Sequence, residues 1–317
     1  MQYVNLGRSG LKISRVSLGS WLTYGNSVGQ DTTDRIVRRA VDLGINLLDT
    51  ADVYNRGEGE KALAGATEGM RRENLVIASK CFFPMSDDVN DRGLSRKHIF
   101  ESVHQSLSRL RTDYLDLYQC HRHDPDTPLG ETVMAMDDLI RQGKVLYWGV
   151  SEWPAEAIIE AVEMAREGGM HPPISNQPKY NLFDREIERD VIPASEKYGV
   201  GQIVFSPLAQ GVLSGKYSPG GDPAKDTRAG NDKVNMFIDR YLDAARLGQA
   251  ARFAEMAARI GVPPSQAALA WCLRKPSVNS VIIGASRLEQ IEENVVAGEL
   301  TLSAEHIQEL EELFPLS

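Results

Sequence analysis

Short apolar segments alternate with amphipathic segments along this chain, and this alternation constrains the fold more than any other feature. The apolar segments resemble buried parallel strands and occupy residues 16–20, 45–49, 75–80, 114–121, 145–151, 174–177, 201–206 and 280–284. Segments with helical spacing occupy residues 32–43, 58–70, 96–110, 128–142, 154 onward, 185–198, 264–275 and 287–298. Eight such units in 317 residues predict an α/β fold, a (β/α)8 TIM barrel with parallel strands and right-handed crossovers.

Three further segments are expected to decorate this barrel. Residues 2–14 read as an N-terminal β-hairpin over one barrel end, residues 208–262 as a long insertion with helical stretches near 236–259, and residues 303–314 as an extra C-terminal helix. No low-complexity linker or break in composition divides the chain, so residues 1–317 are interpreted as a single domain. The rival architecture, an open doubly wound sheet, usually carries GxGxxG after its first strand, and this chain has no such motif there.

Composition excludes several classes of function. A net charge of −9 disfavours nucleic acid or an anionic membrane as the main partner. Residues 1–14 lack the pattern of a secretory signal, and no apolar run approaches the ~20 residues needed to span a bilayer. The three cysteines, Cys81, Cys120 and Cys272, are widely spaced and form no CxxC pair. These features predict a cytoplasmic protein with free thiols and no metal site.

Polar residues end the predicted strands. The series runs Ser20, Asp49, Lys80, His121, Ser151, Gln177 and Ser206, and all would face the same barrel mouth. Tyr54 follows Asp49 by five residues, in the loop after the second strand. Polar caps are expected where loops begin, but an acid, an amine and an imidazole on three successive strands are not. Because catalytic residues of such barrels come from strand ends and the following loops, we predict the active site here.

These four side chains suit the protonation of a carbonyl oxygen. A phenol has an ordinary pKa of about 10 and is a weak acid at neutral pH. An ammonium group at Lys80 would lower the pKa of Tyr54, Asp49 would keep Lys80 charged, and His121 could donate a hydrogen bond to the carbonyl. Such a site still needs a hydride donor. An alternative is a Schiff-base aldolase with Lys80 as the nucleophile, since amine nucleophiles also occur at barrel strand ends.

Several motifs give the chain a resemblance to the aldo-keto reductases along nearly its whole length. They are Gly44-Ile45-Asn46 before Asp49-Thr50-Ala51 and Tyr54; Lys80; His121 before Asp124-Pro125; Gly149-Val150-Ser151; Asn176-Gln177; Ser206-Pro207-Leu208 with Gly211 and Gly215-Lys216-Tyr217; and Gly284-Ala285-Ser286 with Glu293-Asn294. The resemblance implies a (β/α)8 barrel, NADPH bound without a Rossmann motif, and reduction of a small carbonyl substrate. It places the family's catalytic tetrad on Asp49, Tyr54, Lys80 and His121.

Within that family the chain is most similar to the β subunits of voltage-gated potassium channels and their bacterial relatives. Residues 93–98, 199–201 and 270–274 carry this likeness. The channel subunits have Asn where this chain has His121, which favours a working reductase that turns aldehydes or ketones into alcohols. The resemblance also leaves open an NADPH-binding, redox-sensing partner subunit with slow turnover, and it implies a possible homo-oligomer.

The resemblance assigns binding residues as well. The nicotinamide would contact Ser151, Asn176 and Gln177 and stack on Phe205, where the channel subunits have Trp. The whole implied cofactor set is Ser20, Trp21, Gln30, Asp49, Ser151, Asn176, Gln177, Phe205, Ser206, Pro207, Leu208, Gln210, Gly211, Lys216, Arg228, Gly284, Ser286, Gln290, Glu293 and Asn294. Lys216 and Arg228 would face a 2′-phosphate. Many members of the family instead have Lys and Arg after the eighth strand, where this chain has Gly284 and Gln290. Trp21, Phe83 and Trp153 would wall the substrate pocket.

Overall fold

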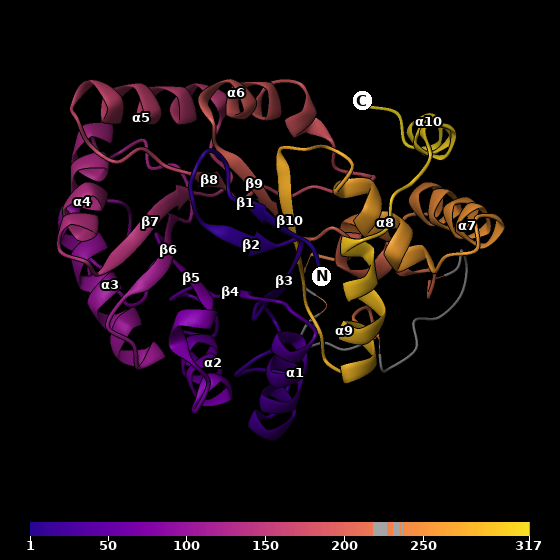
Figure 1. Cartoon of the computed structure of the whole chain (residues 1–317), viewed down its shortest axis with the longest axis horizontal. Helices are drawn as coiled ribbons and strands as arrows, with labels where there is room; N and C mark the ends of the chain where they lie inside the picture. Colours follow the sequence, from indigo (N-terminus) through magenta and orange to yellow (C-terminus); the bar gives the residue numbers. More distant parts are fainter. Residues whose placement is uncertain (218–226, 231–234, 236, 317) are drawn as a thin grey trace.

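A closed barrel of eight parallel strands forms the centre of the protein (Figure 1). A computed structural model describes residues 1–217, 227–230, 235 and 237–316. The barrel strands are β3 (Val16–Gly19), β4 (Leu47–Asp49), β5 (Val76–Cys81), β6 (Leu115–Cys120), β7 (Val145–Val150), β8 (Ser175–Asn176), β9 (Gly201–Val204) and β10 (Val278–Ile283). They pair in chain order, and β10 closes the ring against β3. The predicted (β/α)8 barrel is therefore confirmed.

Helices surround the barrel as the sequence pattern predicts. They are α1 (Gln30–Asp42), α2 (Glu58–Thr67), α3 (Arg96–Leu110), α4 (Leu129–Arg141), α5 (Ala155–Glu167), α6 (Val191–Tyr198), α7 (Ala244–Arg259), α8 (Pro264–Cys272), α9 (Leu288–Val295) and α10 (Ala304–Leu313). Short 3-10 turns add η1 (Arg72–Asn74), η2 (Glu186–Glu188), η3 (Ala209–Ser214), η4 (Asp239–Tyr241) and η5 (Val296–Gly298). Side-chain caps fix several starts; the Ser95 hydroxyl, for example, accepts from the His98 backbone N–H.

Some predicted boundaries differ from the structure. The helical stretches predicted near 236–259 are η4 and α7; the Asp243 side chain caps the start of α7, and residue 236 lies outside the described residues. The helix predicted over 185–198 is divided into η2 and α6. Ser206 and Gly284 lie beyond the ends of β9 and β10, because the chain leaves the ladder into loops at those points.

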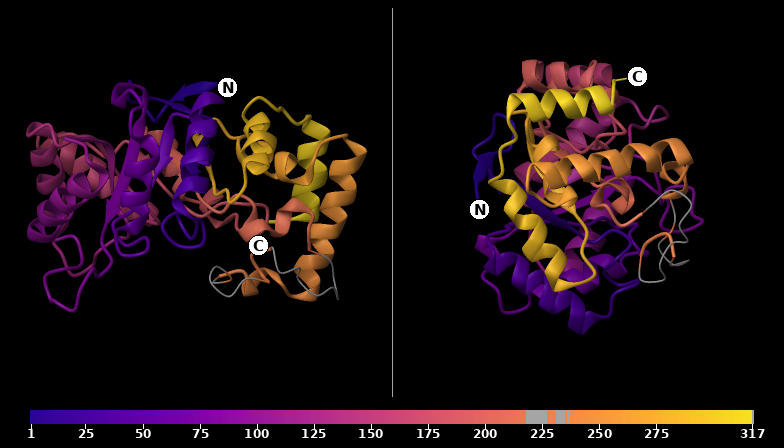
Figure 2. Two further views of the ribbon diagram at one scale, coloured as in Figure 1. Left: turned by 90° about the horizontal axis from the view of Figure 1, so that it is seen from below. Right: turned by 90° about the vertical axis from the view of Figure 1, so that its right-hand side faces the viewer.

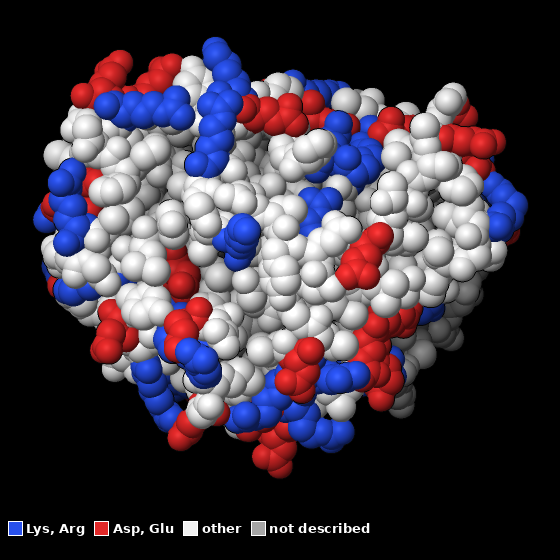
Figure 3. All heavy atoms as spheres, viewed as in Figure 1, with Lys and Arg blue, Asp and Glu red and all other residues white. Residues whose placement is uncertain are grey.

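The N-terminal hairpin covers one end of the barrel, as predicted. Its strands β1 (Tyr3–Asn5) and β2 (Lys12–Ser14) pair antiparallel. Leu6 and Ile13 are fully buried and pack in one cluster with Leu47, Val76 and Leu117, which point into the barrel. Acidic and basic side chains are interspersed around the rim of the face that carries the hairpin (Figure 3). Because this end is plugged, the opposite mouth is left for a site.

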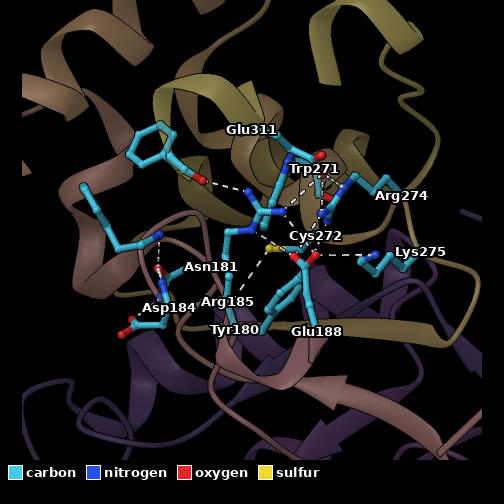
Figure 4. Close-up of polar contacts among 12 residues, drawn as sticks. Tyr180, Asn181, Asp184, Arg185, Glu188, Trp271, Cys272, Arg274, Lys275 and Glu311 are labelled. Atoms are coloured by element: carbon cyan, nitrogen blue, oxygen red, sulfur yellow. Dashed lines mark hydrogen bonds and ion pairs between the residues drawn. The ribbon is translucent and has the colours of Figure 1, made fainter. Parts of the chain in front are cut away.

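The C-terminal helices gather on one side of the barrel, beyond β10 (Figure 2). A buried ionic cluster joins them to η2 (Figure 4). Glu188 pairs with Arg185 and with Arg274 at 3.0 Å each, and the Arg274 guanidinium stacks 3.7 Å from the centre of the Trp271 ring. Arg274 also contacts Glu311 of α10 at 2.8 Å. These contacts fix α8 and α10 against the barrel wall.

Among the described residues, the structure contains no helix of the length and apolarity required to cross a bilayer.

Candidate active site

Side-chain alternation along the strands delivers the charged residues to the barrel lumen. On β5, Val76 and Ala78 face the inner cluster, whereas Ile77 and Cys81 face the helices. Because neighbouring side chains point to opposite faces, Lys80 falls on the inner side with Val76 and Ala78. The same alternation on β4 sets Asp49 inside with Leu47, since Leu48 packs outside. Cys81 and Cys120 are buried on the outer side, as the same alternation requires.

Lys80 is the hub of the resulting site. Its ammonium nitrogen lies 2.7 Å from Asp49 Oδ2, 2.8 Å from the Thr50 carbonyl oxygen and 3.2 Å from the Tyr54 hydroxyl. The Lys80 side chain is completely buried, and Asp49 is 4% exposed. On the other side, Gln177 Nε2 donates to Asp49 Oδ1 at 2.8 Å, and the Ser151 hydroxyl donates to the Gln177 carbonyl. Four strands therefore contribute to one hydrogen-bonded chain that ends at Tyr54.

The loop after β4 holds Tyr54 by its own backbone. The Tyr54 N–H donates to the Ala51 carbonyl, and the next two residues, Asn55 and Arg56, adopt left-handed conformations with φ of 49° and 51°. These angles turn the chain sharply into α2. Gly59 lies against Tyr54, where an added Cβ would meet the Tyr54 backbone oxygen at 3.2 Å. The turn therefore holds the phenol over the end of the barrel.

Two buried carboxyl groups support this loop from behind. Asp52 accepts hydrogen bonds from the Ser102 hydroxyl at 3.0 Å and from the Val53 N–H. Glu60 accepts from the Ser79 hydroxyl and pairs with Arg109 Nε at 2.6 Å. Burial, reinforced by the charge of Glu60, raises the pKa of Asp52 to about 7. The loop that carries Tyr54 is thus joined to α3 by a titratable group.

Electrostatics set the protonation of the catalytic candidates. Burial raises the pKa of Tyr54 more than the Lys80 ammonium lowers it, so the phenol is protonated at neutral pH. The sequence predicted a lowered Tyr54 pKa, and that prediction neglected this burial. Burial by itself would lower the pKa of Lys80, but Asp49 and Tyr54 together outweigh it and keep the amine charged. Burial, Lys80 and Arg122 hold the pKa of His121 well below its usual value, so its imidazole is neutral.

His121 lies next to the phenol within a group of aromatic rings. Its ring centre is 5.6 Å from that of Tyr54 and 5.0 Å from that of Phe83, both edge to face. His121 Nδ1 is buried without a hydrogen-bond partner among the described residues. A neutral imidazole with one donor and one acceptor nitrogen can still donate to a carbonyl oxygen.

A cavity of about 980 Å³ opens above these residues. Its described lining includes Asp49, Tyr54 and His121, with Lys80 buried beneath them. Most residues of the predicted cofactor set also line it, namely Ser20, Trp21, Ser151, Gln177, Phe205, Ser206, Pro207, Leu208, Gln210, Gly211, Lys216, Arg228, Gly284, Ser286, Gln290, Glu293 and Asn294. Of the predicted substrate wall, Trp21 and Phe83 line the cavity.

Three predicted binding residues lie outside that lining. Trp153 is 2% exposed and its ring lies edge to face against that of His123, so its place in the substrate wall stays a prediction. Asn176 is fully buried in β8, where its amide donates to Gln202. The Gln30 amide donates to Asp34 and to the Ala62 carbonyl within the helical layer. Each of these three side chains instead contacts a neighbouring residue outside the cavity lining.

The cavity's wider part has features that suit a dinucleotide. Lys216, Arg228, Arg240 and Arg287 contribute positive charge to the lining. The Arg228 guanidinium donates to the Gln210 side chain, and Asn294 Oδ1 is buried without a hydrogen-bond partner among the described residues. Ser206, Gln210 and Gly211 have φ of 52°, 59° and 98°, a run of left-handed backbone that bends the loop along the cavity. Cationic side chains, exposed backbone and an unpaired acceptor fit a phosphate-bearing nucleotide.

Sequence reasoning missed several lining residues. Arg122 directly follows His121, so the same rule about strand ends could have identified it. Phe237 and Arg240 come from the long insertion, and the Phe237 ring packs 5.5 Å from that of Trp21. No periodicity marks these two residues. Within the part of the chain that the structure describes, no three His, Cys, Asp or Glu side chains are grouped as metal ligands.

Comparison with known proteins bears on this geometry. The family model described as "Aldo/keto reductase family" matches residues 15–314. A protein of Oryza sativa subsp. japonica described as "Probable voltage-gated potassium channel subunit beta" is 42% identical over 300 residues, covering 94% of this chain and 91% of the relative. An Arabidopsis thaliana protein with the same description shows the same identity and coverage. The similarity therefore spans the whole barrel.

Proposed function

Because this chain belongs to the aldo/keto reductase family, a family of oxidoreductases, we propose that it reduces small aldehydes or ketones to alcohols with NADPH. One observation carries the proposal: Asp49, Lys80 and Tyr54 form a buried hydrogen-bonded chain that ends in a protonated phenol at a large cavity. A phenol so held is suited to giving a proton to a carbonyl oxygen as negative charge develops there.

NADPH, when bound, supplies the hydride. The residues present fit such a group, since Lys216 and Arg228 bring charge and Asn294 an unpaired acceptor to the same cavity. Ser151 and Gln177 would hold the carboxamide end, and Phe205 would lie against the ring. Ser286, Gln290, Glu293 and Asn294 would hold the adenosine end, near the N-terminus of α9.

The chain's own residues manage the proton. Tyr54 donates the proton of its hydroxyl to the substrate oxygen. Lys80 Nζ, 3.2 Å away, then donates a hydrogen bond to the phenolate and stabilises its charge. Asp49 keeps Lys80 protonated and aimed, and Gln177 in turn fixes Asp49. His121, held neutral, donates an N–H to the carbonyl oxygen and sets its direction.

The same geometry argues against the aldolase alternative. A Schiff base requires a neutral amine, yet Asp49 and Tyr54 hold the pKa of Lys80 above its usual value. The Lys80 side chain is also wholly buried beneath Asp49 and Tyr54. An attack on a substrate carbonyl by this nitrogen would need the whole chain of hydrogen bonds to break.

A second candidate function rests on the relatives. Because the rice and Arabidopsis proteins are described as potassium channel β subunits, a nucleotide-binding regulatory subunit with slow turnover is the rival proposal. The two functions share the cavity and differ in turnover. His121 favours the reductase, since the resemblance places Asn at this position in the channel subunits.

Steady-state oxidation of NADPH with a panel of aldehydes and ketones tests the proposal, with Tyr54→Phe as the control. The reductase should turn over at least one carbonyl compound rapidly, and Tyr54→Phe should lose that activity while still binding NADPH. A nucleotide that co-purifies with the protein, together with negligible turnover across the panel, would instead support the regulatory subunit.

A further inference from the structure

We propose that the preferred substrate carries a carboxylate or phosphate group near its carbonyl, and that Arg122 binds this anion. The inference rests on the proposed reductase function and adds the chemical class of the substrate. Arg122 directly follows His121 at the end of β6, lines the cavity and is partly buried.

The position of the Arg122 guanidinium is fixed beside the reacting groups. Its central carbon lies 5.3 Å from the centre of the Phe83 ring, and that ring centre lies 5.0 Å from the centre of the His121 ring. The Arg122 side chain also donates a hydrogen bond to the backbone carbonyl of His121. The contact with Phe83 and this hydrogen bond place the guanidinium beside His121, and a guanidinium can bind a carboxylate or phosphate by two parallel hydrogen bonds.

No carboxylate of the described residues neutralises Arg122. Arg109, on the helix that precedes β6, does have such a partner, since it pairs with Glu60. In the cavity lining, Asp49 is engaged by Lys80 and Gln177, and Glu152 Oε1 accepts a hydrogen bond from the Lys179 N–H at 2.6 Å. A guanidinium in the cavity lining with no carboxylate partner among the described residues can therefore pair with an anionic group of a bound molecule.

The charge of Arg122 reaches the catalytic residues. It contributes to lowering the pKa of His121 and opposes the rise in the pKa of Tyr54. An anion bound to the guanidinium would therefore lie close enough for the attached carbonyl to reach Tyr54 and His121. The cations Lys216 and Arg228 belong to the proposed nucleotide region, which leaves Arg122 for the substrate.

Pairs of related aldehydes, one anionic and one neutral, provide the test. Succinic semialdehyde is compared with its methyl ester, 4-carboxybenzaldehyde with methyl 4-formylbenzoate, and glyceraldehyde 3-phosphate with glyceraldehyde. The wild-type kcat/KM should be about 10- to 100-fold higher for the anionic member of at least one pair, the size expected for hydrogen bonds to a charged group. The pair with the largest ratio identifies carboxylate or phosphate as the ligand.

Variants assign that preference to Arg122. Arg122→Met should lose the preference through a higher KM for the anion, with little change for the neutral member. Arg122→Lys should retain part of it. Arg92→Met is the matched control, since Arg92 is exposed, is absent from the described cavity lining and carries the same charge. It should leave the ratio unchanged.

The outcomes separate this inference from the proposed function. Rapid turnover of neutral aldehydes with no charge preference, or a preference that survives in Arg122→Met, would overturn the inference and leave the reductase intact. If no aldehyde is reduced, the proposed function fails. The anion site is then tested by calorimetric binding of 4-carboxybenzyl alcohol compared with benzyl alcohol. Selective binding of the carboxylate that is lost in Arg122→Met supports the site, and equal binding of the two alcohols refutes it.

Discussion

Replacing Lys80 by methionine is the perturbation that most directly tests the proposed mechanism. Methionine has a similarly long, unbranched side chain but lacks the ammonium group, so the change removes three hydrogen bonds, to Asp49, to the Thr50 carbonyl and to the Tyr54 hydroxyl. Burial already raises the pKa of Tyr54, and Lys80 is the largest influence that opposes it. Without Lys80 the phenol should become a weaker acid, and the phenolate it leaves behind should lack its stabilising charge.

The expected loss of activity follows from general acid catalysis, which contributes typically ~10²–10⁴-fold. Tyr54→Phe should lower kcat by about that factor, and Lys80→Met by a comparable one. Asp49→Asn should lower kcat less, because it acts only through Lys80. Combining Tyr54→Phe with Lys80→Met should cost little more than either change alone, as expected when two residues act as one unit.

The same substitution should also affect stability. Lys80→Met leaves Asp49 buried with only the Gln177 hydrogen bond, and breaking one side of a buried ion pair typically costs ~3–5 kcal/mol. Adding Asp49→Asn removes the stranded charge, so the double variant should recover much of that loss. Urea unfolding followed by tryptophan fluorescence measures the change in stability, and single-turnover reduction of a good aldehyde measures the change in catalysis.

Two results would refute the reasoning. One is a Lys80→Met protein that is folded and keeps nearly full kcat. The other is a double variant of Tyr54 and Lys80 whose loss equals the product of the separate losses, because independent residues would then be acting. Asp49→Asn combined with Lys80→Met separates folding from chemistry, since it should be stable and still inactive.

Three further outcomes are expected. Arg228→Ala should weaken NADPH binding more than NADH binding in a fluorescence titration, because Arg228 lines the cavity as a cation, and equal weakening would exclude a contact with the 2′-phosphate. Burial raises the Asp52 pKa from 3.8 to about 7, so ionisation of Asp52 lowers the stability of the fold as the pH rises from about 4 to 7. Asp52→Asn should remove ~2–4 kcal/mol of that pH-dependent loss. If the stability gained by Asp52→Asn over wild type in urea unfolding does not grow with pH, this account is wrong. Burial would raise the Glu188 pKa, but Arg185 and Arg274 lower it from 4.5 to about 2. Glu188→Gln should therefore lower the free energy of unfolding by about 3 kcal/mol at neutral pH, and the unfolding free energies of variant and wild type should converge as the pH falls from 4.5 towards 2. The kcat of the variant should not change.

The sequence by itself determined the barrel and much of the proposed catalytic set. Apolar runs at regular intervals can be buried only as parallel strands between helices, so the eightfold pattern predicted the closed ring that the structure shows. Period-two alternation then decided which side chains face inward, and it set Asp49 and Lys80 in the lumen. These properties are local, because each depends only on spacing along one segment.

Tertiary structure decided which of those side chains contact one another and which of them are protonated. Gln177 lies 128 positions from Asp49 yet donates to it, and Trp153 packs on His123 and is absent from the described cavity lining. Burial reversed the predicted shift of the Tyr54 pKa, and the site gained Arg122 and Phe237 as neighbours. Contacts between distant strands depend on how the closed ring brings those strands together, and pKa values depend on the depth of burial. Neither is encoded in local spacing, so only the folded barrel could reveal them.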